Sequence, residues 1–304
     1  MMKKVLIILV VFISISATFA QQQPLYSQYM FNRFLLNPAI TGNVDYIPLR
    51  LTARQQWVGI DNAPSTQAVS AHMLLGNKSM GVGGYVFVDR FGPETKIGIQ
   101  GTYSYILDLS SWNSKLSFGL ALKAFQYKLD YNQMTAIDEG DEVLYKNSET
   151  AFVPDADFGI YLQGERYFAG VSATQLIQLP IKIAEKEVDK NSMIRHYYLL
   201  GGYKFQLGEK FELEPSILAK GTEKTPFNLD VNLRGIYMEN YWVGASYRTS
   251  GEIIGMLGIK FKSFIFGYAF DYSTSEIKNF QSGSHEIMIG YNFGEDKNKG
   301  SSLL

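Results

Sequence analysis

The strongest constraint on the fold of this chain is an alternation of aromatic residues between positions 264 and 273. That stretch reads FIFGYAFDYS, and its rings occupy every second position: Phe264, Phe266, Tyr268, Phe270 and Tyr272. Successive side chains of a β-strand point to opposite faces, so these rings form one continuous apolar face. Such a face needs either a second layer of protein or the hydrocarbon of a lipid bilayer as its surroundings.

The same period of two recurs along the chain in segments of roughly ten residues. No sustained 3.6-residue apolar stripe is found after residue 20, so we expect few helices. About fourteen strands are predicted, at residues 48–57, 66–75, 80–89, 95–107, 115–128, 153–163, 166–174, 195–206, 211–220, 225–234, 240–249, 252–261, 264–273 and 284–293.

The length of these strands favours a membrane barrel over two soluble alternatives, a large sandwich and a propeller. Strands of globular proteins average about five or six residues, whereas a tilted strand needs about ten to cross a bilayer. A bilayer also requires every backbone polar group to be paired, which a closed barrel achieves. We therefore predict an all-β fold, a transmembrane antiparallel β-barrel of about 14 strands in the outer membrane.

The connections between the predicted strands support this fold. If both ends of the barrel chain lie in the periplasm, every connection after an even-numbered strand is short. Both long connections, residues 129–152 and 175–194, then fall on the outward side. Short periplasmic turns and longer extracellular loops are typical of outer-membrane barrels.

The first twenty residues, MMKKVLIILVVFISISATFA, predict a secretory signal peptide, with Lys3 and Lys4 before an apolar run and small residues before Gln21. A single membrane anchor is the alternative, but the apolar run is short for a span. We divide the rest into an N-terminal periplasmic segment at 21–47, a barrel at 48–293 and a polar tail at 294–304. The segment 21–47 forms either a periplasmic arm or a plug-like element.

Charge and motif content argue against several function classes. Lys and Arg number 28 against 29 Asp and Glu, so there is no electrostatic footprint for nucleic acid. The chain has no cysteine, and therefore neither disulfides nor thiolate chemistry. His72, His196 and His285 have no carboxylate or second histidine at ligand spacing. We expect no catalysis, no cofactor and no metal centre.

Two apolar segments outside the predicted strands are candidates for partner binding. An exposed apolar cluster asks for a partner surface or a barrel lumen, and an apolar outward loop can grip a partner through an edge or a groove. In each case the alternative is packing against the mouth of this barrel itself. The candidate residues are Tyr29, Met30, Phe31 and Phe34 in the first segment, and Leu176, Ile177, Leu179, Ile181 and Ile183 in the loop.

Two further features have a functional and a plain interpretation. Gly290, Tyr291 and Phe293 end the last predicted strand and resemble a barrel-assembly signal, although both rings also suit an aromatic girdle at the membrane interface. The acidic loop 138–142 contains Asp138, Glu139, Asp141 and Glu142. Hard oxygen ligands of this kind bind calcium, but the spacing is irregular, and a solvated acidic loop explains it as well.

Several stretches resemble the PorP/SprF family, and they span essentially the whole chain after residue 20. They include QQPLYSQYMFNRFLLNPAITG, WVGIDNAPSTQAVSAHMLL, VPDADFGIYLQGERYFAGVSATQL, WVGASYR and SGSHEIMIGYNF. The resemblance implies an outer-membrane component of the type IX secretion system of Bacteroidetes, linked in some members to gliding motility. It implies other secretion components and the C-terminal sorting domain of a secreted protein as partners, besides outer-membrane lipid. From the residues alone, a channel for small solutes is the alternative.

Overall fold

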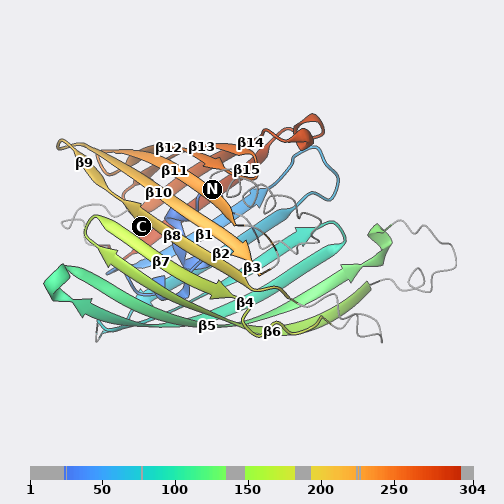
Figure 1. Ribbon diagram of the computed structural model, residues 1–304, viewed down its shortest axis with the longest axis horizontal. Helices are drawn as coiled ribbons and strands as arrows, with labels where there is room; N and C mark the ends of the chain where they lie inside the picture. Colours follow the sequence, from blue (N-terminus) through green and yellow to red (C-terminus); the bar gives the residue numbers. More distant parts are fainter. Residues whose placement is uncertain are drawn as a thin grey trace, which may run out of the picture.

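The computed structural model describes residues 24, 26–76, 78–134, 148–181, 193–223, 225 and 227–295. These residues form one antiparallel sheet that closes into a barrel (Figure 1). Its strands are β1 (Ile47–Gln55), β2 (Ser65–Leu74), β3 (Met80–Phe91), β4 (Glu94–Leu109), β5 (Ser114–Asp130), β6 (Ser148–Gly164), β7 (Tyr167–Thr174), β8 (His196–Tyr203), β9 (Phe205–Leu207), β10 (Phe211–Thr222), β11 (Asn228–Tyr237), β12 (Tyr241–Arg248), β13 (Glu252–Phe261), β14 (Phe264–Ser273) and β15 (Ser284–Phe293).

The barrel closes where its first and last strands meet. β1 runs antiparallel to β15, with Ile47 opposite Phe293 and Gln55 opposite His285. β8 and β9 both pair with β10 and are separated only at Lys204, so together they make one strand of the wall. The wall therefore has fourteen strands, and the predicted fold class is confirmed.

The two faces of each strand have opposite surroundings. In β14, Phe264, Phe266 and Tyr268 are exposed on the outside of the barrel, whereas Ile265 and Asp271 are buried on the inside. This is the arrangement expected of strands that face lipid outside and a packed polar lumen inside. Large side chains obstruct the lumen: Arg234, Trp242 and Arg248 are all buried in it.

Two prolines mark places where the observed strands differ from the predicted ones. Proline has no backbone N–H, and in a sheet it is confined to edges and irregular positions. Pro215 lies in β10 opposite the gap between β8 and β9, which interrupts the single strand predicted at 195–206. Pro154 lies in the part of β6 that extends past β7, because the β6–β7 pairing covers only Phe158–Gln163.

The two ends of the barrel differ in the lengths of their connections. β1 begins at one end, where the turns after β2, β4, β6 and β9 are short; this is called the short-turn end below. The connections that follow β5, β7 and β14 lie at the opposite end, the long-loop end, where the β5–β6 hairpin extends furthest (Figure 1). The predicted separation of short and long connections is thus present.

Candidate functional site: the plugged lumen

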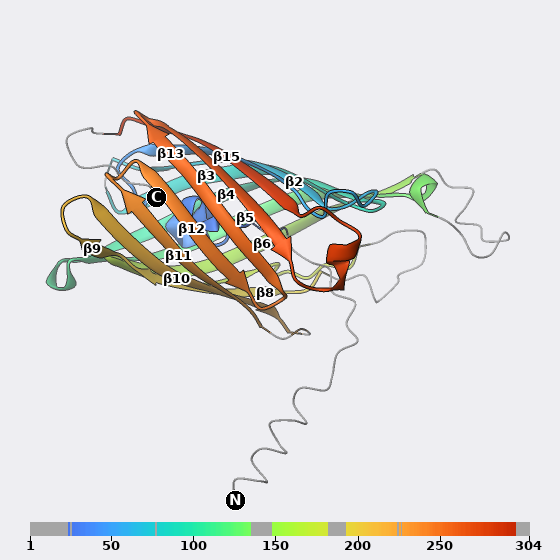
Figure 2. The same cartoon turned by 90° about the horizontal axis from the view of Figure 1, so that it is seen from above.

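The segment Ser27–Asn43, called the plug here, lies inside the barrel, where Figure 2 shows it as a blue coil enclosed by the strands. It consists of three short 3-10 turns, η1 (Tyr29–Phe31), η2 (Arg33–Leu35) and η3 (Pro38–Ile40). The third turn is set by its sequence, since Pro38 begins it and the Asn37 side chain accepts a hydrogen bond from the Ala39 amide at 2.9 Å.

The plug crosses the lumen from the long-loop end towards the short-turn end. Ser27 contacts Asp271, close to the long-loop end of β14. At the other extremity, the Ser117 hydroxyl donates to the Asn43 side chain at 2.9 Å, three residues after the start of β5. The chain therefore traverses most of the barrel before it enters the wall as β1.

A buried charged cluster holds the beginning of the plug. Glu286 accepts hydrogen bonds from the backbone amides of Ser27 and Gln28 at 2.7 and 2.8 Å. Arg54 lies 2.7 Å from Asp271 and 3.4 Å from Glu286, and all three side chains are almost fully buried. The positive charge of Arg54 stabilises the two buried carboxylates, and the Glu286 carboxylate in turn accepts the hydrogen bonds of the plug backbone. The wall and the plug therefore stabilise one another here.

A second charged cluster holds the middle of the plug. Glu214 of β10 lies between two guanidinium groups, 3.0 Å from Arg33 of the plug and 2.9 Å from Arg234 of β11. Arg33 also lies over the ring of Phe168, with its central carbon 3.6 Å from the ring centroid. Planar guanidinium groups suit both contacts at once, which fixes the orientation of Arg33.

Glycines of the wall make room for the second half of the plug. A Cβ atom at Gly119 would collide with the backbone of Pro38 and Ala39, and one at Gly159 would collide with the side-chain amide of Asn37. The Asn37 amide donates to the carbonyl oxygens of Ile160 and Val171 at 3.0 and 3.2 Å. The wall thus fits the plug backbone closely at this depth.

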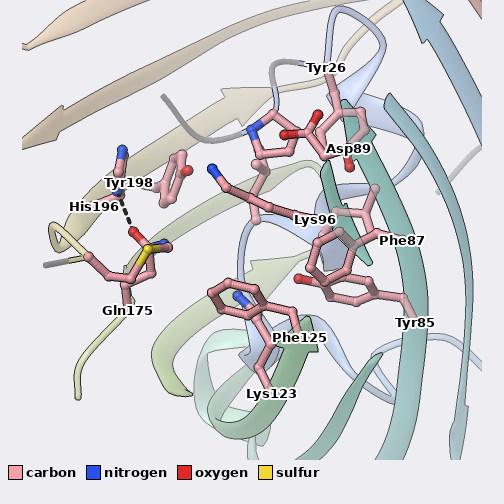
Figure 3. A pocket seen from close by; sticks show the side chains of 14 residues that line it. Tyr26, Tyr85, Phe87, Asp89, Lys96, Lys123, Phe125, Gln175, His196 and Tyr198 are labelled. Atoms are coloured by element: carbon pink, nitrogen blue, oxygen red, sulfur yellow. Dashed lines mark hydrogen bonds between the residues drawn. The ribbon is translucent and has the colours of Figure 1, made fainter. Parts of the chain in front are cut away.

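The plug leaves a cavity in the long-loop half of the lumen (Figure 3). Its walls are largely aromatic, from Tyr26, Tyr85, Phe87, Phe125 and Tyr198. The polar groups at its edge are mostly paired: Lys123 lies 2.8 Å from Asp157, and His196 hydrogen-bonds to Gln175 at 3.0 Å. This arrangement can enclose an apolar or aromatic group beside a few polar ones.

The two predicted partner-binding segments lie in different parts of the structure, the first in the plug and the second at the long-loop end. Tyr29, Met30, Phe31 and Phe34 are at most 2% exposed inside the barrel, which corresponds to the plug-like alternative for their segment. Contact with a partner through these four side chains stays a prediction and would require the plug to leave the lumen.

The predicted loop residues lie in different environments. Ile177 and Leu179 are 47% and 38% exposed at the long-loop end, and Leu176 is half-buried. Ile181 is buried in a cluster with Phe125 and Met193 and so covers the mouth of its own barrel. Ile183 and the acidic loop 138–142 lie outside the described residues, as does the predicted signal peptide.

The end of the last strand lies in an aromatic cluster at the short-turn end. The ring centroid of Tyr291 is 4.7 Å from that of Phe264 and 4.4 Å from that of Phe293. Gly290 faces the lumen beside Arg50. This is the position of a membrane girdle, and the role of the three residues as an assembly signal stays a prediction.

The charged residues that hold the plug were not singled out from the sequence. Asp271 and Glu286 do carry a signal, because each is an acidic residue at an inward position of a strand whose outward face is largely aromatic or aliphatic. Polar residues at such positions are normal for a lumen, so the pattern alone does not indicate a binding partner.

Fold and lumen together define a class: this is an outer-membrane β-barrel whose lumen is closed by its own N-terminal segment. The chain belongs to the PorP/SprF family, because the family model for the type IX secretion system membrane protein PorP/SprF matches residues 18–291. Membership makes it an outer-membrane component of that secretion system and implies interaction with other components.

Solved structures with similar folds are outer-membrane channels. The toluene transporter TbuX of Ralstonia pickettii is 8% identical with a TM-score of 0.54, and the match covers 86% of this chain and 92% of that one. A mutant of the monoaromatic hydrocarbon channel TodX is 10% identical with a TM-score of 0.51, covering 87% and 94% of the two chains. At such identities the likeness concerns the fold alone. No curated protein matches the sequence.

Proposed function

We propose that this barrel supports the export or surface retention of secreted proteins, including gliding adhesins, by binding their C-terminal sorting domain at the long-loop end. It does so as a rigid holder and has no chemistry of its own. Other type IX secretion components would contact it from the periplasm.

The observation that carries this proposal is the plug. The plug, Ser27–Asn43, occupies the lumen and is tied to the wall through Arg54 and Arg33, so it stands in the way of a polypeptide that would pass through the barrel. A closed barrel of the secretion system is better suited to hold a partner on its surface than to conduct it.

The long-loop end offers a surface for such a partner. Ile177 and Leu179 are exposed there beside the mouth of the aromatic cavity, which Gln175 and Met193 also line. The β5–β6 hairpin extends beyond β7: the ladder between β6 and β7 begins at Phe158, and before it the Leu176 amide still donates to the Ala156 carbonyl at 3.0 Å, so among the described residues the edge of β6 is open only before Ala156. An edge and exposed apolar side chains are the elements of β-strand addition.

Co-purification from outer membranes tests the proposal. The wild-type barrel should retain a secreted protein's sorting domain, and the double substitution Ile177→Ser and Leu179→Ser should reduce the amount retained. The matched control is Leu207→Ser, which changes an exposed apolar residue at the short-turn end. Equal retention by all three proteins would contradict binding at the long-loop end.

A channel for small solutes is the second candidate, and the aromatic cavity favours it. Its aromatic lining, from residues such as Tyr85, Phe87 and Phe125, is the kind of wall that a small aromatic molecule would contact. Liposomes that contain the purified barrel distinguish the two functions. Uptake of a labelled aromatic solute would support the channel, whereas impermeable liposomes together with capture of the sorting domain would support the holder.

A further inference from the structure

A second cavity lies between the plug and the wall at the short-turn end. Four cationic and two acidic side chains line it: Arg33, Arg166, Lys204, Arg234, Glu165 and Glu214. Glu212 is also close, 3.5 Å from Lys204. Even with Glu212 counted, the cationic side chains outnumber the carboxylates around this space.

Buried arginine donors remain unused in this cavity. Arg33 and Arg234 each give one nitrogen to Glu214, at 3.0 and 2.9 Å. The Nε and Nη1 atoms of Arg234 and the Nε atom of Arg33 have no hydrogen-bond partner within the described part of the chain. Both side chains are at most 4% exposed, and a buried charged donor without a partner is costly.

The geometry around these donors is held firmly. The guanidinium group of Arg33 lies over Phe168 at 3.6 Å, and that of Arg234 lies over Phe31 at 4.6 Å. Stacking of this kind fixes the plane of each group and the direction of its N–H bonds. Arg166 is exposed at the mouth of the cavity next to Glu165, and half-buried Lys204 lies 3.5 Å from Glu212, so the excess positive charge lies on the buried arginines further in.

We propose that this cavity binds an oxyanion, a carboxylate or phosphate group, that enters from the short-turn mouth. The Nε and Nη1 atoms of Arg234 and the Nε atom of Arg33 can each donate to one oxygen of either group. Arg166 and Lys204 attract the anion, and Tyr161, Tyr167 and Phe168 offer an apolar wall to the body that carries it. The site lies at the opposite end from the proposed sorting-domain surface and does not depend on it.

Titration of the purified, detergent-solubilised barrel with two probes tests the site. Inorganic phosphate and sodium benzoate are added at constant ionic strength, with chloride as the reference anion. Saturable heat and a rise in the unfolding midpoint with either probe, but not with chloride, are expected. Arg234→Lys keeps the charge but loses the separate Nε and Nη1 donors, and binding should weaken by about tenfold or more.

Two further variants keep the test decisive if Arg234→Lys does not assemble. The double substitution Arg166→Gln and Lys204→Gln, the rim variant, changes only side chains at the mouth of the cavity. It should weaken anion binding but leave barrel assembly intact, as judged by the heat-dependent gel mobility of a folded barrel. Lys210→Gln is the matched control, since Lys210 is exposed at the same end but does not line the cavity. A response to phosphate and benzoate no larger than to chloride, or equal binding by the rim variant and the control, would overturn the proposal.

Discussion

The outer and inner faces of this barrel are built from the same strands but make different kinds of contact. The outer face is a broad apolar surface in which residues such as Leu257 and Val243 are more than half exposed. The inner face meets a specific segment of the same chain through buried ion pairs and glycine contacts. Lipid accepts any apolar side chain of roughly the right size, whereas the plug requires particular residues at particular depths.

The largest effect is expected from breaking the charged cluster on the inner face. Arg54→Met would leave buried Glu286 without its arginine and Asp271 with only the more distant Arg248, at 3.8 Å, and removal of one partner of a buried pair costs about 3–5 kcal/mol. The free energy of unfolding in lipid vesicles, followed by urea titration, measures this loss. Arg90→Met is the control, an exposed arginine near the long-loop end, and an equal loss in both variants would contradict the role of the cluster.

A charge on the outer face is expected to have the next largest effect. Leu257→Arg places a guanidinium group in the middle of β13. A charged arginine on the lipid face near the bilayer midplane destabilises a membrane barrel by about 2–4 kcal/mol. Leu207→Arg is matched in exposure, at 55% against 57%, but lies at the short-turn rim. The same urea titration should show a much smaller loss for the rim variant. Equal losses would mean that Leu257 does not face the bilayer interior.

Glycines of the wall test how closely the inner face fits the plug, with a smaller expected effect on stability. Gly119→Ala forces a methyl group against the plug backbone at Ala39, and overpacking of this kind costs about 1–3 kcal/mol. Gly101→Ala adds the same methyl group to an exposed position with no atom near it. Limited proteolysis of the assembled barrel should cut the plug faster in the first variant only. Identical cleavage rates would show that the plug does not press on the wall there.

The smallest effect is expected outside both faces, at Glu223. A hydrogen bond from Tyr197, supported by Arg195, lowers the pKa of this exposed carboxyl below its usual range. Its contribution is therefore present above the pKa of the unfolded chain and is lost as the pH falls through the lowered value. Glu223→Gln should leave the unfolding midpoint unchanged at neutral pH, since exposed ion pairs contribute little. A clear decrease would show that this rim contact matters more than its exposure indicates.

The sequence predicted the wall far better than its contents, and the reason is physical. A strand that faces lipid on one side and a packed lumen on the other has a period of two, which FIFGYAFDYS displays without any knowledge of its neighbours. The plug has no such period. Its apolar residues predicted that something covers them, but the contact between Ser27 and Glu286 joins positions 259 residues apart, and no local pattern specifies such a pair.

The position of the plug is the central claim, and cysteine cross-linking in isolated outer membranes tests it most directly. The chain has no cysteine of its own, and a Cβ atom at Gly159 would lie 2.9 Å from Cγ of Asn37. The pair Asn37→Cys and Gly159→Cys should form an intramolecular disulfide, because a side chain at position 159 would meet the side chain of residue 37 and bring the two sulfur atoms together. Asn37→Cys combined with Gly101→Cys, which faces outward, should not. Absence of a disulfide in the first pair, with both thiols open to maleimide labelling in the assembled barrel, would contradict a plugged lumen.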